Sequence, residues 1–192
     1  MVTTPPSPPL SRVPLRFGAH YAAVVIVEGQ VFVKESRAPN GQVYTFYRLR
    51  LPDGSFLRLP RAHRGRPMSE LVGAHIRGTF WPRTNGQGLL EKFLRLGRIG
   101  APRGDSKGHP FMAAQGRVAF VDREEGRFGL EVRPNPGGRL KEPFTLTLWA
   151  PLALLEELTL GSGVYVEGEA RLKTRRLVVR RLEPAGLWDD PA

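Results

Sequence analysis

The sequence predicts an all-β protein made of two copies of one small unit, and three observations support this prediction. Short runs of alternating apolar and polar residues recur between turn residues, which is typical of half-buried strands. The segment GAHIRGTF, which starts at Gly73, is echoed 90 residues later by GVYVEGEA at Gly163. Upstream, VEGQVFV and AQGRVAFV each place a glycine before an alternating apolar run. Similar features in the same order predict a tandem repeat.

Segments rich in proline and glycine bound the two units. Residues 1–15 combine prolines with Ser and Thr, a composition that predicts a disordered tail. The stretch GRIGAPRGDSKGHP predicts a linker, which we place at 99–109. The expected organisation is a first unit over 16–98, a second unit over 110–185 and a C-terminal tail over 186–192.

In the first unit, strands are expected over residues 22–33, 43–51, 55–59, 74–80 and 89–96. A turn at 38–42 separates the first two strands. Pro52, Asp53 and Gly54 predict the next turn, because proline presets φ and glycine tolerates positive φ. Asn85 and Gly86 predict the last one. A short helix is expected over 67–72, between the third and fourth strands.

The second unit repeats this order. Strands are expected over residues 113–121, 127–132, 144–149, 164–172 and 177–182. A helix is expected over 151–158, where Pro151 suits the first turn and Gly161 and Gly163 suit the end. Three strands, a helix and two further strands predict two tandem five-stranded OB-fold barrels, each with a short helix between strands 3 and 4. An SH3-like barrel is the alternative, and the helix favours the OB fold.

The net charge of +11 is concentrated in one half of the chain. Residues 1–100 hold 15 basic and 5 acidic residues, a net of +10, whereas residues 101–192 hold 14 and 13, a net of +1. A basic chain of this kind suggests a polyanionic partner such as nucleic acid. A thermostable, arginine-rich protein without such a partner is the alternative. Concentration in one half favours a localised binding surface.

Several classes of protein are excluded by what the sequence lacks. There is no cysteine, which excludes disulfides, thiolate zinc sites and cysteine nucleophiles. The four histidines lack ligand spacing, and no phosphate-binding loop or nucleophile elbow occurs, so we expect no enzyme, no metal and no cofactor. No apolar run approaches the ~20 residues of a membrane helix, and no signal peptide is recognisable. We therefore expect a soluble cytoplasmic protein.

Alternation divides the strand over 43–51 into two faces. The face expected inside comprises Val43, Thr45, Tyr47, Leu49 and Leu51. The outer face, extended by the next strand, comprises Tyr44, Phe46, Arg48, Arg50, Phe56 and Arg58. Exposed rings stack on bases, and guanidinium groups hold phosphates, so this face suits single-stranded nucleic acid. The alternative is that the rings pack on the other unit or on a second subunit.

A basic loop, LRLPRAHRGRP, follows this hairpin and supplies Arg61, Arg64 and Arg66. We interpret it as a track for phosphates, with an ordinary solvated loop as the alternative. Trp81 and Arg83 extend the predicted track, although Trp81 equally suits packing. In the second unit, the final hairpin carries Arg171, Lys173, Arg175 and Arg176.

Residues 144–183, FTLTLWAPLALLEELTLGSGVYVEGEARLKTRRLVVRRLE, resemble the end of the bacterial single-stranded DNA-binding protein family. The shared features are an apolar strand that ends in an aromatic residue, a short leucine-rich helix, the string GSGVYVEGEARLKT and a basic hairpin. The resemblance implies that Trp149 stacks on a base. It also implies that Arg171 and Lys173 enter a DNA-binding hairpin. The final LWDDPA is partly similar to the acidic tip through which the family recruits partner proteins. It lacks the family's terminal apolar aromatic residue, so an ordinary polar end at Asp189 and Asp190 is favoured over a recruiting tip.

These observations predict binding of single-stranded DNA with little sequence preference, in replication, repair or recombination. RNA binding is one alternative, and a protein-interaction module within a nucleic-acid complex is another. By analogy with the family, we expect a homo-oligomer, with a dimer favoured. Replication or repair proteins are further candidate partners, and no membrane contact is expected.

Overall fold

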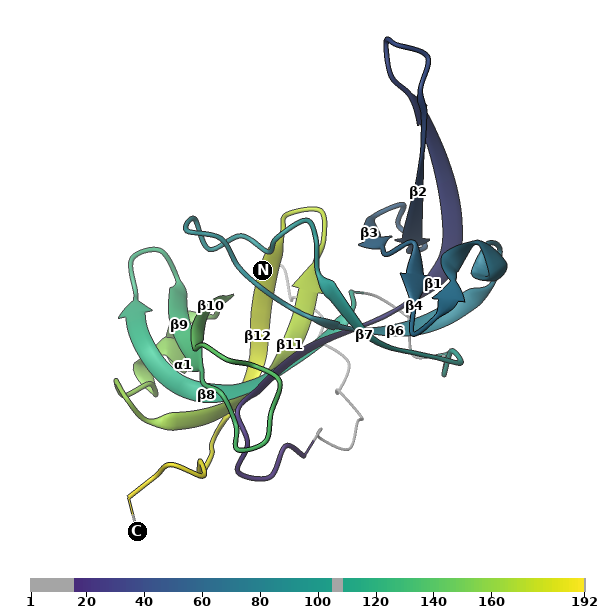
Figure 1. The fold of residues 1–192 in the computed structure, drawn as a ribbon. Coiled ribbons are helices and arrows are strands. Elements are labelled where there is room, and N and C mark those ends of the chain that lie inside the picture. The colour runs from purple at the N-terminus through teal and green to yellow at the C-terminus, as the bar shows by residue number, and fades with distance from the viewer. Residues whose placement is uncertain (1–15, 105–108, 192) are drawn as a thin grey trace.

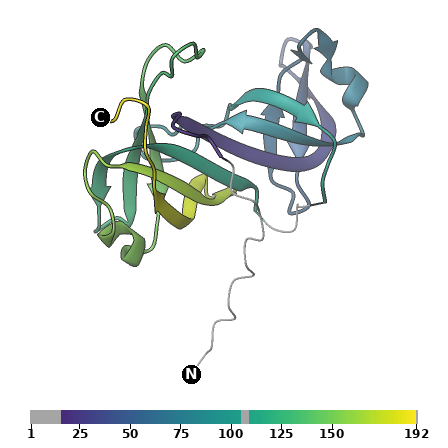
Figure 2. The ribbon, with the colours of Figure 1, turned by 90° about the horizontal axis from the view of Figure 1, so that it is seen from below.

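The computed structural model describes residues 16–104 and 109–191. The tail predicted over 1–15 lies outside the described residues, as do four residues of the predicted linker. The chain is mostly β, and its strands form two groups that lie side by side (Figures 1 and 2). No helix in the described part is long and apolar enough to cross a membrane.

The first group follows the predicted order with one addition. Its elements are β1 (Ala22–Arg37), β2 (Val43–Arg50), β3 (Phe56–Leu59), β4 (Ala62–His63), β5 (Arg66–Pro67), the 3₁₀ helix η1 (Met68–Leu71), β6 (His75–Trp81) and β7 (Arg95–Gly100). The helix expected over 67–72 is thus a single 3₁₀ turn. The addition is a small β4–β5 hairpin inside the basic loop, whose turn places Arg64 at a φ of 51°.

The second group matches the predicted order closely. Its elements are β8 (Phe111–Asp122), β9 (Arg127–Val132), β10 (Phe144–Trp149), the helix α1 (Leu152–Glu156), β11 (Gly163–Arg171) and β12 (Arg176–Pro184). The pairings run from β8 through β9, β10, β12 and β11 back to β8, which makes a closed ring of five strands. In the first group β3 pairs with β2, β2 with β1, β1 with β6 and β6 with β7.

Strand β1 joins the two groups. Its residues Ala22 to Ile26 pair antiparallel with Gln115 to Phe111 of β8, so the ten strands form one continuous sheet. Buried apolar side chains from both groups belong to a single core cluster, which includes Val25 and Leu49 of the first group and Phe128 of the second. The two units are therefore held together by backbone pairing as well as by apolar packing.

Several strand boundaries differ from the sequence expectation. The strand predicted over 89–96 begins only at Arg95, because Leu89 and Leu90 lie in a loop that contacts the second group. The same strand continues to Gly100, two residues into the predicted linker, because Ile99 and Gly100 pair with β6. The first strand also runs beyond 33, since β1 and β2 remain paired as far as Arg37 and Val43.

The inward face predicted for β2 is correct only at its end. Leu49 and Leu51 are buried, but Val43 is exposed and Thr45 and Tyr47 are half-buried. The tip of the β1–β2 hairpin projects away from the rest of the molecule (Figure 1). Alternation places side chains on one face, but that face is buried only where the core lies beneath it.

The glycines of the repeat mark places where two backbones approach closely. A Cβ atom at Gly29 would lie 2.3 Å from the carbonyl oxygen of Arg50, and one at Gly116 would lie 2.3 Å from that of Glu131. The two glycines occupy equivalent positions in the two repeats, Gly29 in β1 and Gly116 in β8. The repeated glycine is therefore a requirement of strand crossing in both units, where no side chain fits.

Candidate nucleic-acid interface

The predicted outer face exists, and it extends across three strands. In the antiparallel register, Arg48 of β2 lies opposite Phe32 of β1 and Arg58 of β3. Neighbouring rows pair Arg50 with Phe56, and Phe46 with Lys34. Paired residues of adjacent strands point to the same side of a sheet. We call the set Phe32, Lys34, Tyr44, Phe46, Arg48, Arg50, Phe56 and Arg58 the basic aromatic face.

Arginines of this face stack against its rings. The guanidinium carbon of Arg48 lies 4.0 Å from the centre of the Phe56 ring. That of Arg58 lies 4.6 Å from the Phe46 ring and 4.5 Å from the ring of Phe93. Each such cation–π contact contributes about 0.5–1 kcal/mol at an exposed site. The stacks hold the guanidinium planes in fixed orientations while their N–H groups remain able to meet an anion.

Three residues near this face were missed by the sequence reasoning. Phe32 and Lys34 follow the same alternation in β1 that was applied to β2, so the pattern was sufficient to find them. Phe93 is 61% exposed and lies in the loop before β7. No periodic signal marks a loop residue, and only the tertiary fold brings Phe93 to Arg58.

The β4–β5 hairpin carries the predicted phosphate track. Arg61, Arg64 and Arg66 are all exposed. Arg66 pairs with Glu70 at 3.2 Å, and Arg64 donates a hydrogen bond to the carbonyl of Gly97 at 3.4 Å. An exposed ion pair of this kind contributes little, so these guanidinium groups remain able to exchange their partners for a phosphate.

Residues 83–91, the loop between β6 and β7, contact the second group of strands. We call this segment the 83–91 loop. The backbone N–H of Leu90 donates to the carbonyl of Arg175 at 2.7 Å, and Arg175 Nε donates to the carbonyl of Leu90 at 2.8 Å. The backbone N–H of Thr147 donates to the hydroxyl of Thr84 at 2.8 Å. The loop is therefore fixed against β10 and the β11–β12 turn.

Several predicted binding residues lie at this contact between the units. The Trp149 indole N–H donates to the carbonyl of Gly88 at 3.4 Å, and the Arg176 guanidinium stacks 3.9 Å from the Trp149 ring. Arg83 stacks 3.3 Å from the Phe144 ring. Burial lowers the pKa of Arg83, and the charge of Glu91 opposes this shift. These aromatic and basic side chains thus stabilise the junction in this structure.

The remaining predicted residues are placed as follows. Trp81 is half-buried, with the Arg95 guanidinium 5.0 Å from its ring. Arg171 pairs with Glu169 at 2.9 Å. Lys173 is exposed in the β11–β12 turn, 4.0 Å from the Asp53 carboxylate. Lys173 therefore lies beside the first unit's turn at 52–54.

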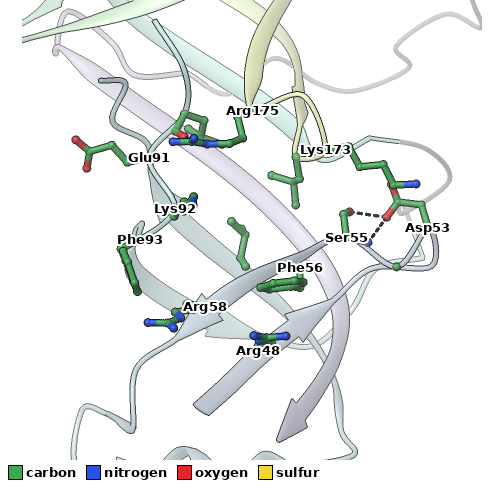
Figure 3. A pocket seen from close by; sticks show the side chains of 14 residues that line it. Arg48, Asp53, Ser55, Phe56, Arg58, Glu91, Lys92, Phe93, Lys173 and Arg175 are labelled. Atoms are coloured by element: carbon green, nitrogen blue, oxygen red, sulfur yellow. Dashed lines mark hydrogen bonds and ion pairs between the residues drawn. The ribbon is translucent and has the colours of Figure 1, made fainter. Parts of the chain in front are cut away.

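A cavity of about 540 Å³ lies between the basic aromatic face and the junction. Figure 3 shows Phe56, Arg48 and Arg58 on one side, Phe93 on a second, and the β11–β12 turn on a third. The charged residues that line it are Arg48, Arg58, Lys92, Lys173 and Arg175, with Asp53 and Glu91. Cations outnumber anions by five to two, so the cavity favours an anionic ligand.

One of the two carboxylates in the cavity, Asp53, already accepts a hydrogen bond from the protein. The Ser55 hydroxyl donates to Asp53 and lowers the pKa of that carboxyl, burial opposes the shift, and the nearby charge of Lys173 supports it. Asp53 therefore stays ionised and anchors the 52–54 turn. Within residues 16–104 and 109–191, no group of His, Asp or Glu side chains is arranged to hold a metal ion.

The C-terminal acids are held by the body of the protein, which the sequence reasoning did not foresee. Asp189 accepts hydrogen bonds from the Tyr21 hydroxyl at 2.7 Å, from Arg117 at 2.8 Å and from Arg133 at 3.0 Å. Asp190 accepts a further bond from Arg117 at 2.7 Å. The expected polar end is thus an ion-paired latch that fastens residues 187–190 beside the start of β1.

Replacing Asp189 by asparagine is expected to lower the free energy of unfolding by about 2 kcal/mol at neutral pH. Burial alone would raise the pKa of Asp189, but hydrogen bonds from Tyr21, Arg117 and Arg133 outweigh it and lower the pKa from 3.8 to about 2. Because the folded pKa lies below the unfolded one, this stabilisation is present above about pH 4 and is lost toward pH 2.

Urea denaturation at pH 7, 4 and 2 measures this effect. The difference in unfolding free energy between wild type and Asp189→Asn should disappear as the pH falls. The exposed acid Glu124 offers a matched control, because Glu124→Gln removes one charge far from the latch. A gap that is independent of pH would show that the Asp189 carboxylate does not hold the tail through its charge.

Comparison with known proteins places the fold. No protein-family model matches the chain, and no curated protein sequence matches it significantly. Among solved structures, a deletion variant of the single-stranded DNA-binding protein from Thermus aquaticus aligns with a TM-score of 0.51 and 20% identity, over 90% of this chain and 98% of that one. The wild-type protein of that organism aligns with a TM-score of 0.49 and 18% identity, over 91% and 98%.

The chain therefore has the all-β fold of a bacterial single-stranded DNA-binding protein. One solved structure that it matches is the deletion variant from Thermus aquaticus, and that match runs through nearly the whole of both chains. The resemblance inferred from residues 144–183 is thereby confirmed for the fold and extended to the first unit.

Proposed function

We propose that this chain binds single-stranded nucleic acid, with DNA as the first candidate and with little sequence preference. The basic aromatic face is the observation that carries the proposal. It places three arginines and three phenylalanines on one side of β1, β2 and β3, with the rings partly exposed. The likeness of the fold to a single-stranded DNA-binding protein supports the same function.

The proposed architecture is two tandem five-stranded OB-fold barrels, over 16–98 and 110–185, with the connecting linker at 99–109. The closed ring of β8 to β12, with α1 between β10 and β11, supports this topology in the second unit. In the first unit η1 takes the place of the helix. The face of strands 2 and 3 is where OB barrels bind oligonucleotides, and here it corresponds to β2 and β3.

Binding would combine stacking with phosphate contacts. Bases stack both on aromatic rings and on guanidinium planes, and the face offers both kinds of surface at alternating positions. Arg50 is exposed and Arg48 and Arg58 are half-buried. Their accessible N–H groups would meet phosphates, and Arg61, Arg64 and Arg66 would continue the track. Every base has a π-face and every nucleotide a phosphate, so such contacts carry little sequence preference.

The second unit has a different part in this proposal. Trp149, Arg83 and Arg176 take part in the junction, so we assign them to holding the two barrels together. The β11–β12 turn contributes Lys173 and Arg175 to the edge of the binding surface. We propose that the chain acts by binding and not by catalysis, in the cytoplasm and in DNA replication or repair. We further propose that it forms a homo-oligomer, with a dimer favoured.

Anisotropy titration of a labelled oligo-dT across a salt series tests the proposal. With about six phosphate contacts, log affinity should fall with log salt at a slope of about −4, so affinity drops roughly 250-fold between 50 and 200 mM salt. Competition by oligo-U then separates DNA from RNA preference. If neither oligonucleotide binds at low salt, the proposal is wrong and the exposed rings serve a protein contact.

A further inference from the structure

We propose that the 540 Å³ cavity is a composite nucleotide site, in which both units hold the same nucleotide of a bound strand. This inference rests on the proposed function and adds to it a place and a partner for each unit. The first unit supplies a stacking platform, and the second supplies a cationic turn. The ligand is a base with its phosphate.

The lining of the cavity has an apolar part and a charged part, and we call the charged part the rim. Its apolar side chains come from three places in the chain: Phe56 and Leu57 of β3, Leu90 and Phe93 of the loop before β7, and Leu172 of the β11–β12 turn. Phe56 and Phe93 are 44% and 61% exposed. Large exposed rings beside an apolar hollow are typical of a surface that a ligand covers.

The charges around the rim fit the phosphate of such a ligand. Arg48 and Arg58 lie on the side of β2 and β3, stacked against Phe56 and Phe93. Lys173 lies on the side of the second unit and extends toward Asp53 (Figure 3). Lys92 lies beside Phe93 in the chain. A cavity of this volume falls within the range of about 300–1,000 Å³ that small-ligand sites occupy. An aromatic hollow with a cationic rim matches a nucleotide in shape and in charge.

Contacts within the protein hold the two sides of the site in place. The two hydrogen bonds between Leu90 and Arg175, at 2.7 and 2.8 Å, fix the β11–β12 turn against the 83–91 loop. The stacks on Phe56 and Phe93 fix the arginines on the opposite side. A preorganised site loses less conformational entropy on binding, so its contacts contribute more to affinity.

The contact between the two units also limits which parts of the second unit can reach a bound strand. The 83–91 loop lies over Trp149 and Thr147, where the carbonyl of Gly88 and the hydroxyl of Thr84 accept hydrogen bonds. A Cβ atom at Gly88 would lie 2.7 Å from the Thr147 side chain, so the loop is in close contact with β10. A strand that leaves the basic aromatic face therefore meets the second unit first at the β11–β12 turn.

A double-mutant cycle on Phe93→Ala and Lys173→Ala tests the shared site, with a short labelled oligo-dT as the probe. Loss of one stacking ring should lower affinity about 10-fold, and loss of one lysine contact about 3-fold at low salt. Because both side chains contact the same nucleotide, the double variant should lose clearly less than the product of the two. If the loss of affinity in the double variant equals the product of the two single losses, Phe93 and Lys173 contact separate nucleotides and the inference is overturned.

Leu160→Ala and Lys141→Ala are matched controls, because both residues are exposed on the second unit away from the cavity. Photo-crosslinking with iodo-deoxyuridine gives a second readout, and it should label the peptides that contain Phe93 and Lys173. If Phe93→Ala and Lys173→Ala bind oligo-dT as tightly as wild type does, the composite site is wrong and the proposed function stands. If wild type does not bind, the proposed function itself fails.

Discussion

Replacing Arg48, Arg50 and Arg58 together by alanine is expected to lower the affinity for oligo-dT by about 100-fold at low salt. Each phosphate contact is assigned about 1 kcal/mol, and three of them amount to two powers of ten in affinity. The slope of log affinity on log salt should become shallower by about 2, because each lost contact removes about 0.7. Anisotropy titration at four salt concentrations measures both quantities.

Two further variants separate charge from stacking at these positions. The triple lysine variant keeps three positive charges but loses the planar groups that stack on Phe46, Phe56 and Phe93. Its salt slope should remain that of wild type, while its affinity falls by a smaller factor than in the alanine variant. A slope that falls equally in both triple variants would contradict a role for these arginines as phosphate contacts.

The matched control removes the same charge elsewhere. Arg123, Arg139 and Lys141 are exposed on the second unit, and their replacement by alanine also lowers the net charge by three. This control should weaken binding only slightly, through the long-range field. If it weakens binding as much as the face variant does, the chain binds by overall charge and the basic aromatic face has no special role.

The sequence was most informative where a local pattern has one structural solution. Alternation in 43–51 placed Arg48 and Phe46 on one side, because a β-strand allows only two faces. The repeated glycines indicated a tandem repeat, and the structure places them at the same strand crossing in both units, where a backbone oxygen lies 2.3 Å from the Cβ position. The helix after β10 was found from Pro151, which begins α1 as its N-terminal cap.

Contacts between distant segments were beyond the reach of these patterns. The 83–91 loop carries no periodicity, so nothing in its sequence showed that it docks on Trp149 and Arg175. Asp189 is 72 residues from Arg117, and neither residue has a neighbour in sequence that marks the pair. The exposed Val43 was predicted to be buried because alternation gives the face of a strand but not the extent of the core.

Replacing Gly168 by alanine is expected to destabilise the protein by about 3 kcal/mol or more. A Cβ atom at this position would lie 1.8 Å from the carbonyl oxygen of Val178 and 2.9 Å from the Cα atom of Val179. Both obstacles are backbone atoms of β12, so no side-chain rotation can relieve the clash. The β11–β12 register already shifts between Glu167 and Gly168, which is where the two backbones approach each other.

Urea denaturation measures the loss of stability in Gly168→Ala, and oligonucleotide binding measures the effect on the β11–β12 turn. β11 and β12 carry the turn with Lys173 and Arg175, so a forced separation at Gly168 should move that turn away from Leu90. Gly100→Ala is the matched control, because Gly100 also lies in a strand and a Cβ atom there meets nothing within 4 Å. Gly78→Ala should fall between the two, since its obstacle at 2.7 Å is the edge of the Phe80 ring, a side chain and not backbone. Equal stability of Gly168→Ala and Gly100→Ala would contradict the close approach of β11 to β12.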